Sequence, residues 1–327
     1  MTTLPTLGTT LYSFTPEFHA YKYTFEDLVR TVAEAEIGPG LEIVGFQSIK
    51  GFPTITAEFE HTFRALIDET GLQPSCLAVN VDTGRRRDRF LTDDEVVDFM
   101  TAQIEAAHQL GFPVARMQNL ATPDVMERLA PVAEKYDVKL GMELHAPSTV
   151  RAGWAATLLE RYEKVGSPYL GFIPDFGAST RRLAPSLFQE FTARGVSQQV
   201  QDEVRETYEQ GKLIYPLIEG FAERGEPAAA RVFATGASLF GGMDVSEWAD
   251  IVPWTVHVHG KFYDIDADGD EPTIDYKSIL RIFLEGGYAG TISSEWEAWH
   301  WVTNPDARTM IQKHQAMERR YLAELTA

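Results

Sequence analysis

The chain has 327 residues, enough for one large α/β barrel or for two ordinary domains. Apolar residues make up 44% of the chain, which supports a large core and argues against a disordered protein. The 29 basic and 48 acidic residues give a net charge of −19, which argues against nucleic-acid or membrane-surface binding. The basic run Arg85–Arg89 is a local exception, and we interpret it as a solvated loop.

The single cysteine, Cys76, lies in an apolar run and is expected to be a buried core residue. The first residues lack the basic start and apolar stretch of a signal peptide. No run approaches the ~18 apolar residues that span a membrane. We therefore expect a soluble, cytoplasmic protein.

Short apolar runs alternate along the chain with segments whose apolar residues are spaced three and four apart, as in helices. The eight runs that we predict to be strands start near Leu7, Gly40, Pro74, Val114, Lys139, Leu170, Trp254 and Gly290. Alternating strands and helices imply parallel strands with right-handed crossovers. No glycine-rich phosphate turn follows the first strand, which argues against a doubly wound open sheet. The pattern predicts one (β/α)8 TIM-barrel domain over residues 1–327.

One interval breaks this rhythm. Leu170 and Trp254, where the sixth and seventh predicted strands start, lie 84 residues apart, whereas the other starts are separated by 25 to 40 residues. The excess, about 176–245, contains helical patterns and leaves the carboxyl end of a strand, which is the active-site face of this fold. It is either a helical excursion without a role, or a lid or docking surface for another chain.

The last four predicted strands each end with a carboxylate or an imidazole at the mouth of the barrel. We predict that Glu143, Asp175, His259 and Glu295 are the ligands of one divalent metal ion. Three converging carboxylates would repel one another unless a cation lay among them. A mostly oxygen ligand set with one imidazole suits Mn²⁺ best, with Mg²⁺, Co²⁺ or Zn²⁺ as alternatives.

Side chains two residues apart on a strand share a face. His145 therefore points the same way as Glu143, one step nearer the mouth, and we predict that it transfers the proton in catalysis. A structural role for His145 is the alternative. His257 is expected to lie behind His259, next to the metal ligands.

Further residues near the mouth are predicted to contact the substrate. Lys261 and Glu297 each follow a metal ligand by two residues, and the aromatic residues of the mouth could stack on a substrate or serve only in packing. These aromatic residues are Tyr12, Phe14, Trp296 and Trp299.

The four predicted ligands on strands five to eight resemble the metal tetrad of the xylose isomerase-like sugar-phosphate isomerase/epimerase barrels. The segment IDYKSILRIFLEGGYAGTISSEWE is similar to the last βα unit of that family. Ketose epimerases of the family carry a second catalytic Glu and a His where this chain has Thr149 and Ala178, which argues against the chemistry of those epimerases.

More narrowly, the chain resembles the catalytic α subunit of bacterial C-glycoside deglycosidases. The matching features are the Glu-Leu-His motif at Glu143, the His-Gly-Lys-Phe-Tyr stretch from His259, the Ser-Ser-Glu-Trp-Glu-Ala-Trp ending and the long insertion. This resemblance implies metal-dependent cleavage of the sugar–aryl C–C bond of 3″-oxo-C-glucosides. It also implies a histidine acid/base and a small β subunit in a hetero-oligomer.

Two other functions remain open from the sequence. The same metal and base without a leaving group would isomerise or epimerise a sugar or inosose. The metal could instead be structural in a non-enzymatic binding protein. In addition, Asp264–Asp275 has the spacing of an EF-hand calcium loop, although its last ligand is Asp rather than Glu, and a polar barrel loop is the competing interpretation.

Overall fold

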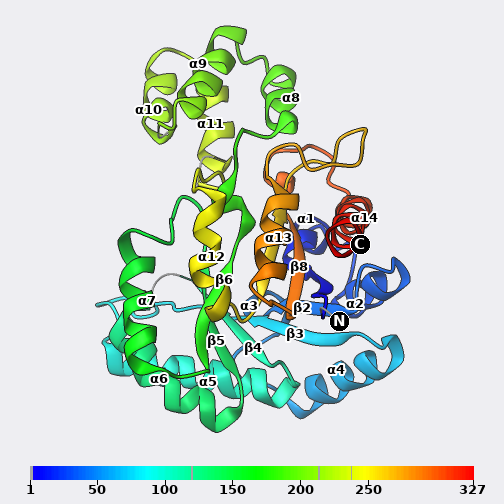
Figure 1. Ribbon diagram of the computed structural model, residues 1–327, viewed down its shortest axis with the longest axis vertical. Helices are drawn as coiled ribbons and strands as arrows, with labels where there is room; N and C mark the ends of the chain where they lie inside the picture. Colours follow the sequence, from blue (N-terminus) through cyan, green and yellow to red (C-terminus); the bar gives the residue numbers. More distant parts are fainter. Residues whose placement is uncertain (1–2, 119–120, 213, 237) are drawn as a thin grey trace.

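Eight parallel strands form one sheet that curls into a barrel in the computed structural model (Figure 1), which describes residues 3–118, 121–212, 214–236 and 238–327. The strands are β1 (Thr6–Thr10), β2 (Gly40–Val44), β3 (Gln73–Ala78), β4 (Val114–Met117), β5 (Lys139–Leu144), β6 (Leu170–Pro174), β7 (Val258–Phe262) and β8 (Thr291–Trp296). The order is β6-β5-β4-β3-β2-β1-β8-β7, and bridges Phe172–Thr255 and Asp175–His259 bring the two edges together. The predicted (β/α)8 barrel is confirmed.

Helices cover the outside of the barrel. They are α2 (Phe25–Glu34), α4 (Ala57–Thr70), α5 (Asp93–Leu110), α6 (Pro123–Tyr136), α7 (Gly153–Val165), α12 (Trp248–Ile251), α13 (Tyr276–Glu285) and α14 (Ala307–Thr326), with short α1 (Thr15–His19) and α3 (Gly45–Ser48) at the mouth. Reciprocal capping boxes start α2 and α5, as the Thr24-to-Asp27 and Thr92-to-Glu95 spacings predict. None of the described helices is long and apolar enough to cross a membrane.

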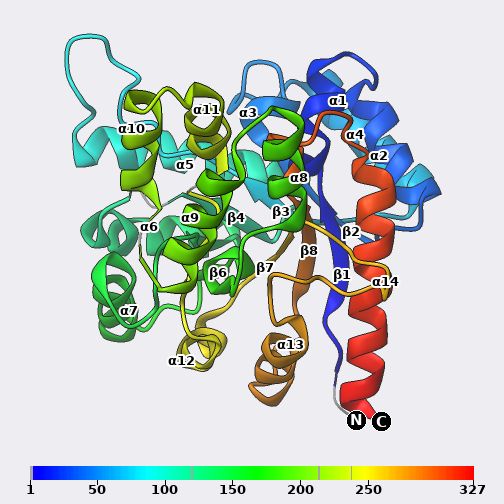
Figure 2. The same ribbon diagram turned by 90° about the horizontal axis from the view of Figure 1, so that it is seen from above.

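The last helix closes the structure against the first strand. Helix α14 lies beside β1, so the two ends of the chain are neighbours (Figure 2). The buried amide of Gln315 donates hydrogen bonds to the carbonyl oxygens of Gly8 and Ile37, both at 2.9 Å. Cys76 is fully buried, as expected.

The seventh strand begins later than predicted. Val252–Trp254 form a 3-10 turn with Pro253 near its start, and the strand proper starts at Val258. The Thr255 amide donates to the Val252 carbonyl oxygen at 3.1 Å, so this turn takes up the start of the predicted strand. Two residues of the predicted strand still contact β6, because Thr255 forms a bridge with Phe172 and Val256 donates a hydrogen bond to the Phe172 carbonyl oxygen.

The long segment between β6 and β7 forms a helical lobe above the mouth of the barrel (Figure 1). Its helices are α8 (Pro185–Ala193), α9 (Gln198–Glu209), α10 (Tyr215–Glu223) and α11 (Pro227–Gly236). Val204, Phe221 and Ala229 are fully buried, so the lobe has apolar residues of its own inside it. The Tyr208 hydroxyl donates to the carbonyl oxygen of Gly241 at 2.6 Å and also contacts Thr180, which ties the lobe to the turn after β6.

The chain leaving the lobe is fixed to the turn that follows β6. The Gly241 amide donates to the Gly177 carbonyl oxygen, and the amides of Gly242 and Met243 both donate to that of Ala178, all at 2.9 Å. A Cβ atom on Gly241 would lie 2.0 Å from the Ala178 carbonyl oxygen. The contact therefore needs glycine at this position.

We predict that Gly241→Ala destabilises the protein by about 1–3 kcal/mol, because two backbone segments must move apart. Gly242→Ala is the matched control, since a Cβ atom there meets no atom within 4 Å. We expect the control to stay within about 0.5 kcal/mol of the parent. Urea unfolding of the three proteins measures both values, and equal midpoints for all three would contradict the predicted strain.

Candidate metal centre

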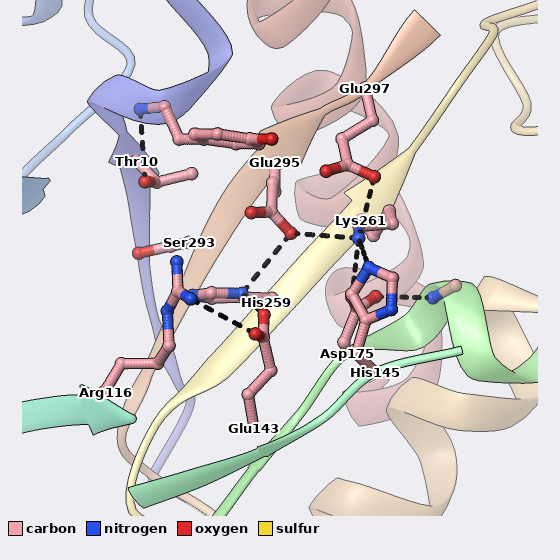
Figure 3. A network of polar contacts seen from close by, with 12 residues as sticks. Thr10, Arg116, Glu143, His145, Asp175, His259, Lys261, Ser293, Glu295 and Glu297 are labelled. Atoms are coloured by element: carbon pink, nitrogen blue, oxygen red, sulfur yellow. Dashed lines mark hydrogen bonds and ion pairs between the residues drawn. The ribbon is translucent and has the colours of Figure 1, made fainter. Parts of the chain in front are cut away.

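Four residues from the last four strands converge at the barrel mouth, as their places at the strand ends predict (Figure 3). Glu143 belongs to β5, His259 to β7 and Glu295 to β8, and Asp175 follows β6 directly. All four are buried. The His259 Nδ1 atom lies 2.8 Å from Glu143 Oε1 and 3.3 Å from Glu295 Oε2. The ligand atoms of these three residues lie within 4.8 Å of one another, which is close enough to hold one ion.

The structure places Asp175 slightly apart from this group. Its Oδ2 atom lies 2.6 Å from the Lys261 ammonium, and its Oδ1 atom accepts a hydrogen bond from the Gly177 amide at 2.8 Å. The same ammonium lies 2.8 Å from Glu297 Oε2 and 3.6 Å from Glu295 Oε2. The Lys261 ammonium therefore lies between Asp175 and two glutamates, Glu295 on β8 and Glu297 just after it.

The donor set fits a divalent cation. Five buried carboxylates, from Glu42, Glu143, Asp175, Glu295 and Glu297, surround two cationic side chains, Arg116 and Lys261. Asp175 Oδ2 and Glu297 Oε2 are buried and pair with the Lys261 ammonium, and the buried Glu295 Oε2 lies 3.3 Å from His259 Nδ1 and 3.6 Å from Lys261 Nζ. Buried carboxylates are stable only when hydrogen-bonded, paired or bound to a metal. Five carboxylates outnumber the two cationic side chains, and this excess of negative charge on oxygen atoms suits a hard, oxygen-preferring ion.

Nearby charges act differently on the three glutamates of the cluster. Burial opposes ionisation of Glu143, but Arg116 and then His259 hold the pKa of that carboxyl well below its usual range. Burial also opposes ionisation of Glu295, but His259 and Lys261 lower its pKa. For Glu297 burial dominates, and it raises the pKa of the carboxyl even though Lys261 is close. Glu143 and Glu295, the two glutamates among the predicted metal ligands, are thus held in the ionised form.

Sequence reasoning missed Glu42, which holds His259 from behind. Glu42 is fully buried on β2, with Oε1 2.9 Å from His259 Nε2 and Oε2 3.0 Å from His257 Nε2. A carboxylate on Nε2 fixes that nitrogen as the donor and leaves Nδ1, which faces Glu143 and Glu295, free to bind a metal. His257 also contacts Ser293 and so takes the expected place behind His259. A lone acidic residue in the apolar run GLEIVGF was the available signal.

Glu42 also belongs to a second possible ligand group among the described residues, with Cys76 and His257. Both Glu42 oxygens already contact histidine nitrogens. Burial, followed by the charge of Glu42, raises the pKa of the Cys76 thiol well above its usual range. A metal-binding cysteine must be a thiolate, so this group is a poor metal site.

Arg116 is the second residue that the sequence did not reveal. It lies on β4, buried, with one guanidinium nitrogen 3.2 Å from Glu143 Oε2. Glu143 therefore offers one oxygen to His259 and the other to Arg116. The arginine fixes the orientation of this carboxylate and offsets part of the excess charge.

His145 lies beside the cluster and is only partly buried. Its Nδ1 atom is 2.7 Å from the Ala146 carbonyl oxygen, which can only accept, so Nδ1 carries the proton. Nε2 then presents its lone pair, and it lies 3.0 Å from Lys261 Nζ and 3.6 Å from Asp175 Oδ2. The arrangement gives His145 a defined basic atom next to the predicted metal ligands.

The predicted substrate-binding residues occupy different environments. Tyr12 is half-buried, meets Trp299 edge-to-face at 5.4 Å and lies with its hydroxyl 3.4 Å from His300 Nε2. Phe14 and Trp296 are buried, and the Trp296 indole donates to the Tyr263 carbonyl oxygen at 2.8 Å. These two side chains pack in the core, so a substrate contact for Trp296 has no structural support and stays a prediction.

Four aspartates of the acidic loop Asp264–Asp275 have carboxylates that contact other groups of the protein. Asp266 Oδ1 accepts the amides of Asp268 and Asp270, Asp264 accepts the Ser186 amide, and Asp275 caps α13. Asp270 also pairs with Arg320. These contacts are those of a polar barrel loop, the competing interpretation of the EF-hand spacing.

Comparisons with known proteins agree with the barrel fold. Residues 33–319 match the sequence model of the xylose isomerase-like TIM barrel. The chain is 45% identical to the 3'-dehydrocarminate deglycosidase alpha subunit of a Microbacterium species, over 99% of this chain and 97% of that protein. It is 44% identical to a C-glycoside deglycosidase alpha subunit of Arthrobacter globiformis, over 96% and 90%.

The solved structure of an L-ribulose 3-epimerase shares the fold, with a TM-score of 0.60 and 11% identity over 99% of this chain and 96% of that one. The chain therefore belongs to the xylose isomerase-like TIM-barrel family and, within it, to the alpha subunits of the C-glycoside deglycosidases.

Proposed function

We propose that this chain is the catalytic subunit of a metal-dependent lyase that cleaves the sugar–aryl C–C bond of 3″-oxo-C-glucosides. The observation that carries the proposal is the Nε2 lone pair of His145, which faces the Lys261 ammonium at 3.0 Å beside the carboxylate cluster. The chain that carries it matches deglycosidase alpha subunits over nearly its whole length. A metal centre alone would serve many reactions, whereas a fixed base next to it suits abstraction of a proton from a sugar carbon.

Glu143, Asp175, His259 and Glu295 would hold the ion, with Mn²⁺ as our choice for a set of three carboxylates and one imidazole. A divalent ion there supplies Lewis acidity toward the oxygens of a 3-oxo sugar. For Asp175 to serve, the Lys261 ammonium must leave Oδ2. Its contacts with Glu297 and His145 offer it other partners.

The chemistry assigned to the protein is a β-elimination. The ketone at C3 acidifies the hydrogen on C2, and His145 Nε2 removes it as a proton. The electron pair of the C2–H bond forms a C1–C2 double bond, and the C1–aryl bond breaks with its electron pair on the aryl carbon. That carbon takes a proton from the protonated His145 or from water. The products are an unsaturated 3-oxo sugar and the free aglycone.

Lys261, Glu297 and Tyr12 are proposed to position the sugar. Lys261 can donate to a substrate oxygen, and Glu297 and Tyr12 lie on the same side as His300 at the rim. Without a leaving group the same base would isomerise a ketose or an inosose, which is the alternative function. The assay of His145 variants described below separates these reactions.

We further propose a small β subunit as partner, in line with the "alpha subunit" names of the relatives. Tyr21, Phe46 and Phe90 are strongly exposed, at 94%, 61% and 77%. They follow β1, β2 and β3, so all three lie on the catalytic face of the barrel. Exposed aromatic residues on one face are typical of protein–protein interfaces.

We predict that Glu143→Gln and Glu295→Gln each lose the metal. Removal of a direct ligand should weaken binding by more than the ~10–100-fold that an outer partner contributes. Elemental analysis after dialysis should find about one manganese-class ion per parent chain and little in the variants. Glu297→Gln, a buried glutamate two residues from Glu295, is the control and should keep its metal. Full metal occupancy in Glu143→Gln and Glu295→Gln would remove Glu143 and Glu295 from the ligand set.

The second prediction concerns the base. His145→Ala should keep fold and metal but release aglycone from a 3″-oxo-C-glucoside about 10²–10⁴-fold more slowly, because it loses the proton-transfer group. Lys313→Ala, an exposed change on α14, serves as control. Unchanged turnover would exclude His145 from the mechanism. If the parent protein interconverts ketoses or inososes and never releases an aglycone, the isomerase function is correct.

The third prediction concerns the partner. A Phe46→Ser, Phe90→Ser double variant should lose co-purification with a co-expressed small β subunit while its own unfolding midpoint stays unchanged, since both side chains face solvent. Leu4→Ser, at an exposed apolar residue just before β1 and thus at the opposite end of the barrel, is the control. Size-exclusion chromatography reports the complex. Retention of the complex by the double variant would move the interface elsewhere.

A further inference from the structure

A pocket of about 1160 Å³ lies between the helical lobe and the barrel. Its walls come from the β5–α7 loop, the turn after β6, helices α9 and α10, and the segment that leaves the lobe. The residues that matter here are Thr149, Ser179, Tyr208, Ile214, Phe240 and Met243. None of the metal-centre residues described above lines it, so the pocket adjoins the metal centre without sharing its residues.

Two loops connect this pocket with the metal centre. His145 belongs to the centre, and Pro147, two residues later, lines the pocket. Asp175 belongs to the centre, and Ser179, four residues later, lines the pocket. An extended residue spans at most ~3.6 Å, so the Cα atoms in these pairs lie within about 7 Å and about 14 Å of each other. A ligand a few rings long could therefore reach from the centre into the pocket.

The turn after β6 lies between the metal centre and the pocket. The Gly177 amide donates to Asp175 Oδ1, and a Cβ atom on Gly177 would lie 2.6 Å from Lys261 Cδ. The next residues of the turn, Ser179 and Thr180, line the pocket. One short turn thus contacts the metal centre on one side and the pocket on the other.

The chemistry of the walls indicates the kind of ligand. The rings of Tyr208 and Phe240 and the aliphatic side chains of Ile214 and Met243 suit a flat apolar molecule. Ser179 is 1% exposed, and among the described residues its hydroxyl oxygen has no hydrogen-bond partner, so it can bond to a ligand hydroxyl.

The charges of the lining argue against an anionic ligand. Two basic residues, Arg181 and Lys212, face three acidic ones, Glu209, Glu219 and Asp244. Arg181 is already paired with Asp275. A phosphate or carboxylate would thus meet no excess of positive charge.

We propose that this pocket binds the aryl aglycone of the substrate, a planar polyphenol, while the sugar lies at the metal centre. The proposal rests on the proposed function and adds the place and the chemistry of aglycone recognition. It also gives the lobe a role, because α9 and α10 supply one wall of the pocket.

The test fills the pocket without touching the metal centre. Gly242 lines the pocket, its φ is not in the left-handed region, and a Cβ atom there meets no atom within 4 Å. Gly242→Trp should therefore fold and occupy the space of the ligand. Gly220→Trp is the matched control, since it lies on α10 outside the lining and its Cβ atom is equally unhindered. The probe is the flavone luteolin, measured by equilibrium dialysis against the full-length, manganese-loaded protein.

We expect Gly242→Trp to weaken luteolin binding and to raise KM for a 3″-oxo-C-glucosyl flavone, each at least tenfold, with manganese content unchanged. Gly220→Trp should match the parent in all three measurements. Ser179→Ala should weaken luteolin binding about fivefold, the value of one ordinary hydrogen bond, without loss of stability. Removal of a hydroxyl with a purely structural role would change stability and leave binding intact.

The outcomes separate this proposal from the proposed function. Parent-like luteolin binding and KM in Gly242→Trp would overturn the pocket assignment while leaving C–C cleavage intact. A parent protein that binds luteolin but cleaves no C-glucoside would contradict the proposed reaction alone. If Gly242→Trp then fails to bind luteolin, the pocket is still an aryl-binding site. Absence of luteolin binding by the parent would overturn the pocket assignment whatever the reaction.

Discussion

The crowding of buried carboxylates at one end of the barrel is the constraint on which the rest of the site depends. Glu42, Glu143, Asp175, Glu295 and Glu297 are all buried there. Such a cluster would be strongly destabilising without cations, because each charge loses its hydration and repels the others. Arg116 and Lys261 supply part of the compensation. The site is thus suited to take up further positive charge, and His145 lies beside it.

Much of this site could be predicted because the barrel itself orders it. Parallel strands deliver their carboxyl ends to one face, so polar residues ending four successive runs had to meet. The alternation of side chains also predicted that His257 lies behind His259. Glu42 and Arg116 escaped because they lie inside runs that look entirely like core strand. Only the register across the closed barrel shows that Glu42, on β2, reaches His259, on β7.

The sequence predicts where the helical lobe lies but not what it does. The number of residues between the sixth and seventh strands indicates the place of the lobe, and the helical spacing of apolar residues there indicates that it consists of helices. The contact of Gly241 with Gly177 depends on how the returning chain meets the turn after β6, and no local sequence pattern encodes that distance. The pocket between lobe and barrel is likewise a property of packing, since its walls come from four segments distant in sequence.

The two sides of the metal centre differ in how firmly they are held. On one side, His259 is fixed between Glu42 and Glu143, and Arg116 fixes Glu143 in turn, all of them fully enclosed. On the other side, one flexible lysine serves Asp175, Glu297 and His145 together. An ammonium with three partners can give up one and keep two, whereas a histidine held at both nitrogens cannot turn. The fixed side suits binding of an ion and the exchangeable side suits proton transfer. The exchangeable side is also where the loops toward the pocket begin, so His145, Lys261 and the pocket lie on the same flank of the barrel mouth.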